Sequence, residues 1–163
     1  LKAALLADGA TPLDIADALA EAKAVKVSAR RPSALVIGAD QTMDDAGRLH
    51  DKPESIAVAR ERLQALRGRA HQLHSAVVVA QGSAPIWRTV ESATLTMRPF
   101  SDAYLDGYLA RGGEALLSSV GGYQLEGEGA QLFESVRGDY FTILGLPLFG
   151  LLALLRRHGV LET

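Results

Sequence analysis

The sequence predicts an α/β fold, a mixed sheet with flanking helices arranged as two lobes of a single domain over residues 1–163. Segments with the helical period of apolar residues alternate along the chain with apolar or alternating runs that are typical of strands. The chain has 163 residues, a length that favours one domain, and 48% of them are hydrophobic, which is enough for a sizeable core. We find no repeat, linker or low-complexity tract, so one continuous fold is expected.

The first well-marked helix begins at Thr11. Thr11 can cap the helix, Pro12 suits its first position, and Asp14 is favoured at its positive end. The helical period then continues to about residue 26, which puts Lys23 near the C-terminal end of the helix. The turn that follows, at 30–33, leads into a strand.

The strand 34–38 is the most informative part of the chain. Its four apolar residues predict a buried strand that ends at Gly38, and Asp40 follows two residues later. Strand ends beside glycine are where open α/β sheets place ligand and catalytic groups, and glycine lets backbone or ligand approach closely. Asp40 is therefore a candidate general base or metal ligand; the alternative is an acid that caps a turn.

The later elements are predicted from the same patterns of caps, periodicity and turn residues. In chain order they are a hairpin turn at 44–47, a helix at 53–66, strands at 73–80 and 87–97, a helix at 101–111, a strand at 130–136, a loop at 137–145 and a helix at 147–158.

Two further segments carry candidate binding residues. Lys52 lies in a turn directly before Pro53 and could meet the charge of a phosphate; alone it would be read as a solvated surface lysine. The segment 121–129 is rich in glycine and encloses Glu126 and Glu128, which favours a ligand-facing loop over a merely flexible turn. His71 and His74 show no third zinc ligand at a suitable spacing, so we interpret them as structural or peripheral.

Composition excludes several classes of protein. The formal net charge of −2 is far from the basic footprint of a protein that binds a nucleic acid polymer. No apolar run approaches the roughly 18 residues that span a bilayer, and no signal peptide is visible, so neither a membrane partner nor secretion is expected. The chain holds no cysteine, which excludes thiolate chemistry and fits a cytoplasmic location.

Several pieces of sequence together resemble one family along nearly the whole chain. They are Ala22-Lys23-Ala24, Val36-Ile37-Gly38-Ala39-Asp40-Gln41-Thr42, Lys52-Pro53, Leu66-Arg67-Gly68-Arg69-Ala70-His71, Ser75-Ala76-Val77, Tyr108-Leu109, Gly121-Gly122-Tyr123, Glu126-Gly127, and Gly138-Asp139-Tyr140 through Gly145-Leu146-Pro147. In order and spacing they resemble the Maf family of nucleoside triphosphate pyrophosphatases, also called septum formation proteins.

The resemblance implies a two-lobed Maf/ITPase-like fold with a nucleotide cleft. It implies hydrolysis of a nucleoside triphosphate between its α and β phosphates, with a divalent metal cation, Mg or Mn, and a homodimer. The family pattern makes Asp40 the catalytic acid/base position, and sequence alone leaves open whether Asp40 binds the metal, takes the water proton, or both. Lys23 and Lys52 match lysines that line the phosphate site.

Two departures from the family pattern shape the expectation. A Ser-x-Ser-Pro-Arg-Arg-like loop that grips the triphosphate is absent, so the chain as given is expected to be N-terminally incomplete and incomplete as a catalyst. One family branch has threonine after the aspartate and glutamine in the glycine loop and prefers dTTP and UTP. This chain has Gln41 and Glu126, like the branch that acts on 7-methyl-GTP. A carboxylate at Glu126 can accept from the donor edge of guanine and repels pyrimidine acceptors.

Three alternatives remain open from the sequence. The chain could be a non-catalytic nucleotide-binding regulator of septum formation, which the sequence upstream of Leu1 would help to decide. It could also be a pyrophosphatase of the dTTP/UTP type. A metal-dependent phosphatase of another fold would need a second acidic motif, for which Asp139 is the only contender.

Overall fold

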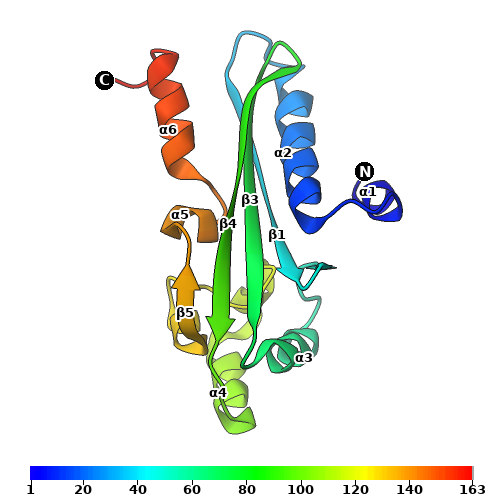
Figure 1. Ribbon diagram of the computed structural model, residues 1–163, viewed down its shortest axis with the longest axis vertical. Helices are drawn as coiled ribbons and strands as arrows, with labels where there is room; N and C mark the ends of the chain where they lie inside the picture. Colours follow the sequence, from blue (N-terminus) through cyan, green and yellow to red (C-terminus); the bar gives the residue numbers. More distant parts are fainter. Residues whose placement is uncertain (163) are drawn as a thin grey trace. The chain divides into compact units, whose positions relative to one another are not determined.

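The computed structural model describes residues 1–162, which form a five-stranded sheet with helices packed against it (Figure 1). The strands follow the order β2-β1-β3-β4-β5, with β2 antiparallel to β1 and β5 antiparallel to β4. Their bounds are β1 Val36–Asp45, β2 Arg48–His50, β3 Ala70–Gln81, β4 Ala84–Met97 and β5 Phe133–Arg137. The predicted α/β fold class is therefore confirmed.

Several of the helices begin directly after a capping residue. They are α1 Lys2–Ala7, α2 Pro12–Ser28, α3 Ile56–Leu66, α4 Asp102–Gly112, α5 Tyr140–Ile143 and α6 Leu148–Arg157, with 3-10 segments η1 Gly113–Ser118 and η2 Glu128–Leu132. Thr11 and Asp14 form a reciprocal capping box at the start of α2, and Ser55 and Ser101 cap α3 and α4. No helix within residues 1–162 combines the length and the apolar character needed to cross a membrane.

The chain divides into two compact units, in agreement with the expected two lobes. The first unit comprises residues 1–42, 74–92 and 139–163, and the second comprises 43–73 and 93–138. Strands β1, β3 and β4 contribute residues to both units. Each unit is described below by itself.

The first unit is built around β3, whose two faces are covered by different helices. One face of the strand packs on α2 and the other on α6, which flank the strands in Figure 1. The α2 side consists of Ala16, Ala20, Ala24, Ala76, Val78 and Ala80, and the α6 side of Val77, Val79, Leu151 and Leu154. Because successive residues of a strand point to opposite faces, an unbroken apolar run is what a strand covered on both faces requires.

Helix α2 lies unusually close to β1 because both elements present small residues at the contact. Gly38 is buried, and a Cβ atom built on it would lie 2.4 Å from the carbonyl oxygen of Ala20 and 2.6 Å from the amide nitrogen of Ala24. No side chain larger than hydrogen fits between the helix and the strand at this point. It is therefore the backbone of α2, and not a ligand, that comes close to the chain at Gly38.

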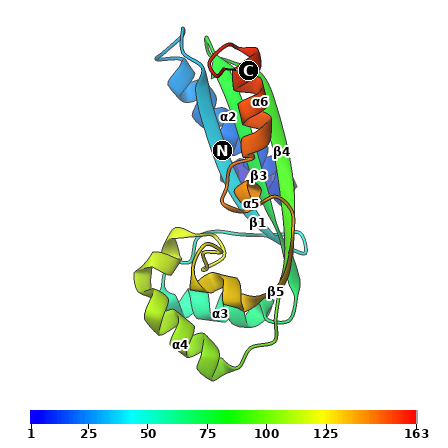
Figure 2. The same cartoon turned by 90° about the vertical axis from the view of Figure 1, so that its left-hand side faces the viewer.

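The second unit holds a helical layer against the ends of β3 and β4. Helix α3 packs against α4 and η1, and Figure 2 shows these segments beside one another. The buried apolar residues of the two helices are Ala59, Leu63, Leu66, Leu105, Tyr108 and Leu109. Since α3 begins four residues after Lys52 and α4 leads toward the segment 121–129, this layer supports both candidate binding segments.

Several boundaries differ from the sequence prediction. The helix expected from 53 begins at Ile56, and the strands expected from 73 and 87 begin at Ala70 and Ala84. The strand expected to end at Gly38 continues to Asp45, so Asp40 lies within β1 and not after it. Polar side chains in this stretch find partners elsewhere, as where Thr42 Oγ1 donates to the carbonyl oxygen of Pro12 at 2.7 Å, and the chain can stay extended. The predicted strand at 130–136 begins only at Phe133 after a 3-10 turn, and the loop at 137–145 contains α5.

Candidate functional site

Lys23 and Asp40 form an ion pair in the first unit. The Nζ atom of Lys23, on α2, donates to the carboxylate of Asp40 and, at 2.9 Å, to the carbonyl oxygen of Ala39. The side chain of Asp40 is 17% exposed and that of Lys23 is 56% exposed. The close contact of α2 with β1 at Gly38 therefore brings together two residues that the sequence places in the site.

This pair offers two chemical capabilities at one place. A carboxylate with one oxygen on an ammonium group keeps a second oxygen that can accept a proton or bind a cation. The exposed ammonium group of Lys23 can also meet a negatively charged ligand without movement of α2. An arrangement of this kind suits chemistry at phosphorus, where negative charge must be countered while a water is activated.

Gln41 is tied to the protein through its side-chain amide. Its Nε2 atom donates to Ser75 Oγ at 2.8 Å and to the carbonyl oxygens of Thr142 and Ile143 at 3.0 and 2.9 Å. Two carbonyl acceptors fix the orientation of the amide, because only its NH₂ group can donate. These contacts occupy the NH₂ group and anchor the backbone directly after Asp40.

The start of α5 completes this anchor. Thr142 is buried; its amide nitrogen donates to Asp139 Oδ2 at 2.9 Å, and its hydroxyl lies 3.1 Å from Glu91 Oε2. Ser75 Oγ donates to the carbonyl oxygen of Thr142 at 2.6 Å. Asp139, the contender for a second acidic motif, thus caps a short helix in this structure.

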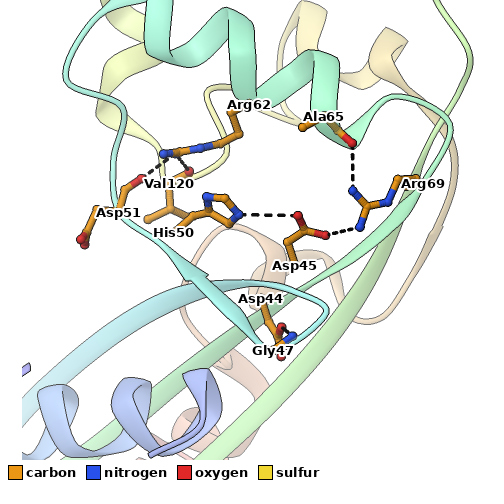
Figure 3. Close-up of polar contacts among 9 residues, drawn as sticks. All are labelled: Asp44, Asp45, Gly47, His50, Asp51, Arg62, Ala65, Arg69 and Val120. Carbon is orange, nitrogen blue, oxygen red and sulfur yellow. Dashed lines mark hydrogen bonds and ion pairs between the residues drawn. The ribbon is translucent and has the colours of Figure 1, made fainter. Parts of the chain in front are cut away.

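Lys52 lies in the second unit, in an exposed position between β2 and α3. The hairpin before it is fixed by Asp45, which accepts from Arg69 Nη2 at 2.8 Å and lies 3.7 Å from His50 Nε2 (Figure 3). Burial, together with the nearby arginines, lowers the pKa of His50. The loop of Lys52 therefore leaves from a well-anchored hairpin.

Glu126 is also in the second unit, exposed in the glycine-rich segment 121–129. The buried Tyr123 holds the start of this segment, with its hydroxyl 2.6 Å from His71 Nε2 and its amide nitrogen donating to Ser119 Oγ at 3.0 Å. Burial lowers the pKa of His71 to about 4, so the imidazole is neutral at pH 7. His71 is thus buried and in contact with Tyr123, which fits the structural and not the peripheral interpretation.

A cavity of about 290 Å³ lies beside the same glycine-rich segment. Its lining comes from α4, η1 and the segment itself: Tyr108, Arg111, Gly112, Ala115, Leu116, Gln124, Gly127, Glu128 and Gly129. Arg111 Nε donates to Glu128 Oε2 at 2.8 Å at this site. The cavity therefore lies against the same segment that carries the exposed Glu126.

The structure brings Lys23 and Asp40 into contact in the first unit, where the side chain of Gln41 points to Ser75 and α5, and it puts Lys52 and Glu126 in the second unit. That all five serve one nucleotide stays a prediction. The sequence analysis did not identify the anchoring role of Ser75. A polar residue inside the apolar run 73–80 was the available signal, because a buried hydroxyl needs a partner.

Asp40 is also the residue to consider as a protein ligand for a divalent metal ion. Among residues 1–162 there is no group of three or more side chains placed to hold a metal ion. Mg²⁺ is commonly bound through one or two carboxylates together with substrate phosphates and water, so a single carboxylate such as Asp40 fits that pattern.

Comparison with known proteins gives consistent relatives. The chain is 68% identical over 162 residues to the nucleoside triphosphate pyrophosphatase of Caulobacter vibrioides, covering 99% of this chain and 81% of that protein. It is 51% identical over 163 residues to the 7-methyl-GTP pyrophosphatase of Rhizobium meliloti, covering 100% and 82%. For the 7-methyl-GTP pyrophosphatase of Brucella abortus the identity is 49% over 162 residues, covering 99% and 81%.

The model of one protein family, described as Maf-like protein, matches residues 3–158. The resemblance drawn from separate motifs is thereby confirmed over almost the entire chain. The chain belongs to the family of Maf-like proteins.

Proposed function

We propose that this protein hydrolyses a nucleoside triphosphate between its α and β phosphates, releasing the nucleoside monophosphate and pyrophosphate. The observation that carries the proposal is the pair of Lys23 and Asp40, a cation and a carboxylate fixed at one place in a chain whose relatives are named as pyrophosphatases. Hydrolysis of a phosphoanhydride needs both groups, a base for the water and positive charge for the phosphates.

In the proposed mechanism Asp40 is the proton acceptor. A water oxygen bonds to the α-phosphorus, and the bond from this phosphorus to the oxygen that bridges it to the β-phosphorus breaks. Pyrophosphate leaves with the electron pair. The water proton passes to the carboxylate of Asp40. Lys23 and Lys52 bind the phosphate oxygens and counter the charge that develops on them. The hydrogen bonds of Gln41 to Ser75 and Thr142 support this role, because they hold the strand on which Asp40 is carried.

A divalent cation, Mg²⁺ or Mn²⁺, is part of the proposal. One oxygen of the Asp40 carboxylate would be its protein ligand, and the other would take the water proton once Lys23 binds the phosphate oxygens. When bound, the ion would supply Lewis-acid stabilisation of the phosphates. The substrate phosphates and water would complete its oxygen coordination.

For the base we propose a modified purine, with 7-methyl-GTP as the leading substrate. Glu126 carries this proposal: its carboxylate can accept from the N1–H and N2 amino groups of guanine, and a methyl group on N7 adds ring charge that a carboxylate favours. Gln41 supports this preference indirectly, by holding its part of β1 in place, because its NH₂ group is occupied by protein acceptors. The runner-up is a pyrophosphatase for dTTP and UTP.

We further propose that the protein works as a homodimer in the cytoplasm. The lack of cysteine supports a reducing compartment. Large apolar side chains near α5 and α6, with Tyr140 48% and Phe149 63% exposed, support an interface at this face. Sedimentation of the full-length gene product, with and without Phe149→Ser, tests the assembly; a monomeric wild type would contradict it.

The activity is tested by incubating the full-length gene product with a panel of canonical and modified triphosphates and measuring pyrophosphate and orthophosphate separately. Asp40→Asn is isosteric and should lower kcat/KM at least tenfold, about 1.4 kcal/mol in barrier height. Asp8→Asn, which removes an exposed carboxylate of the same unit, is the control. Retention of more than a tenth of wild-type activity by Asp40→Asn would contradict the assignment. Binding without turnover in the wild type would favour the regulatory alternative.

Base preference is tested by Glu126→Gln. The ratio of kcat/KM for 7-methyl-GTP to that for UTP should fall by a factor that corresponds to about 1–3 kcal/mol, the range for a lost charge-assisted hydrogen bond. The reason is that glutamine presents a donor beside its acceptor. Glu128→Gln is the matched control on the same segment. A wild type that prefers UTP, or an unchanged ratio, would show that the substrate class is wrong.

A further inference from the structure

Arg62 occupies an unusual position in the second unit. It lies on α3 and is half buried, and its Nη1 atom donates to two backbone carbonyl oxygens, those of Asp51 and Val120, each at 2.5 Å (Figure 3). Its Nε atom is buried and has no hydrogen-bond partner among the described residues. Burial lowers the pKa of the guanidinium group, as expected for a charge removed from water.

The two acceptors belong to the two segments that carry the proposed binding residues of this unit. Asp51 directly precedes Lys52, the proposed phosphate ligand. Val120 directly precedes the segment 121–129, which carries Glu126, the proposed base ligand. One guanidinium group thus joins the entry to one segment with the entry to the other.

A second observation supports the contact between these two segments. A Cβ atom built on Gly122 would lie 3.5 Å from Cβ of Ala59 and 4.0 Å from Cγ of Pro53. Gly122 has a φ of +72°, which an L side chain rarely adopts. The glycine-rich segment therefore packs directly against the residue that follows Lys52, at the place that Arg62 bridges.

A role in fold stability alone accounts poorly for this arrangement. A buried charge with an unpaired Nε atom costs free energy that an apolar side chain at the same place would avoid. The guanidinium group offers several donors in a fixed plane, which a lysine ammonium on its flexible stem does not reproduce. The geometry therefore favours fixed spacing of the two segments as the property that Arg62 supplies.

We propose that Arg62 is a positioning residue that sets the spacing between the phosphate-binding Lys52 segment and the base-reading Glu126 segment. This inference rests on the proposed function. Two binding elements at fixed spacing act on one ligand with a high effective concentration, whereas each fragment of the ligand needs only its own element. Loss of the bridge should weaken binding of the intact triphosphate while leaving binding of the separate fragments nearly unchanged.

The test compares Arg62→Met and Arg62→Lys with Arg60→Met in the full-length gene product. Arg60 lies on the same helix and forms an ion pair with Asp106, so its removal costs the same charge without touching the two carbonyl groups. For each variant we would measure kcat and KM for 7-methyl-GTP, and inhibition constants for inorganic pyrophosphate and for 7-methyl-GMP.

Arg62→Met should raise KM about tenfold, with Arg62→Lys between it and the wild type, and leave both inhibition constants within about twofold. Arg60→Met should change none of these values by more than about twofold. The proposal is overturned if KM for Arg62→Met stays within twofold of the wild type, or if the inhibition constants rise as much as KM. It is also overturned if only kcat falls, or if neither Arg62 variant folds. An inactive wild type would instead reject the proposed function.

Discussion

Substitution of Gly38 by alanine is the sharpest test of how the Lys23–Asp40 pair is built. The added Cβ would lie 2.4 Å from the carbonyl oxygen of Ala20, 2.6 Å from the amide nitrogen of Ala24 and 2.8 Å from its Cβ. Ordinary contacts need ~3.5 Å, so α2 must move outward by about 1 Å. Two of the three atoms met are backbone atoms, which no rotamer change can remove from the contact.

Overpacking of a core costs typically about 1–3 kcal/mol, and the backbone contacts put Gly38→Ala at the upper end, near 3 kcal/mol. The reduced entropy of the unfolded chain offsets only about 0.4–1 kcal/mol of this. For a chain of this length the melting temperature should fall by about 5–10 °C. The activity should fall as well, because Lys23 moves with α2.

Thermal and urea unfolding of Gly38→Ala beside Gly107→Ala checks this reasoning. Gly107 lies within α4, where a Cβ would meet only the flexible end of Arg111 at 3.1 Å. Alanine there should leave stability unchanged or raise it by about 0.5–1 kcal/mol. If Gly38→Ala keeps the wild-type stability and loses only ligand affinity, then the glycine serves approach of a ligand and our account of the α2 contact is wrong.

Two further predictions concern stability. Burial lowers the pKa of His71 from 6.5 to about 4, so the unfolded chain binds a proton between these values that the folded chain refuses; the free energy of unfolding should fall by about 3 kcal/mol as pH drops from 6.5 to 4. Urea titrations across this range should show a smaller fall for His71→Gln, and an equal fall in both proteins would assign the effect to other groups. Leu151→Ala should cost about 2–5 kcal/mol, because it opens a cavity between α6 and β3; a loss below 1 kcal/mol in urea unfolding would contradict the assignment of α6 to the core.

Local signals in the sequence were sufficient for much of the fold. The capping box of Thr11 and Asp14 and the turn at 44–47 depend on residues within three positions of each other, which pattern reasoning detects. The end of β1 was missed because Gly38 reads as a strand end, whereas it is the contact point of a helix 14 to 18 positions earlier in the chain. A single sequence does not distinguish a glycine that ends a strand at a turn from a glycine that allows close packing.

The candidate site could be predicted from the sequence only where residues belong to a recognisable motif. Family motifs singled out Lys23 and Asp40, and the structure brings them into contact. Arg62 could not be found from the sequence, since its acceptors are backbone carbonyl groups 11 and 58 residues away and any residue type can offer a carbonyl oxygen. A positively charged residue beside the buried Leu63 was the only hint.

The two-sided burial of β3 has a consequence for the order in which the molecule can fold. Val77 and Val79 are covered by α6, which is synthesised some seventy residues later. While the ribosome makes the intervening segment, one face of the central strand stays exposed to water. Contacts so distant in sequence slow folding and leave an apolar strand open to association with other chains. A nascent chain of this protein should therefore need protection from aggregation until its last helix has emerged.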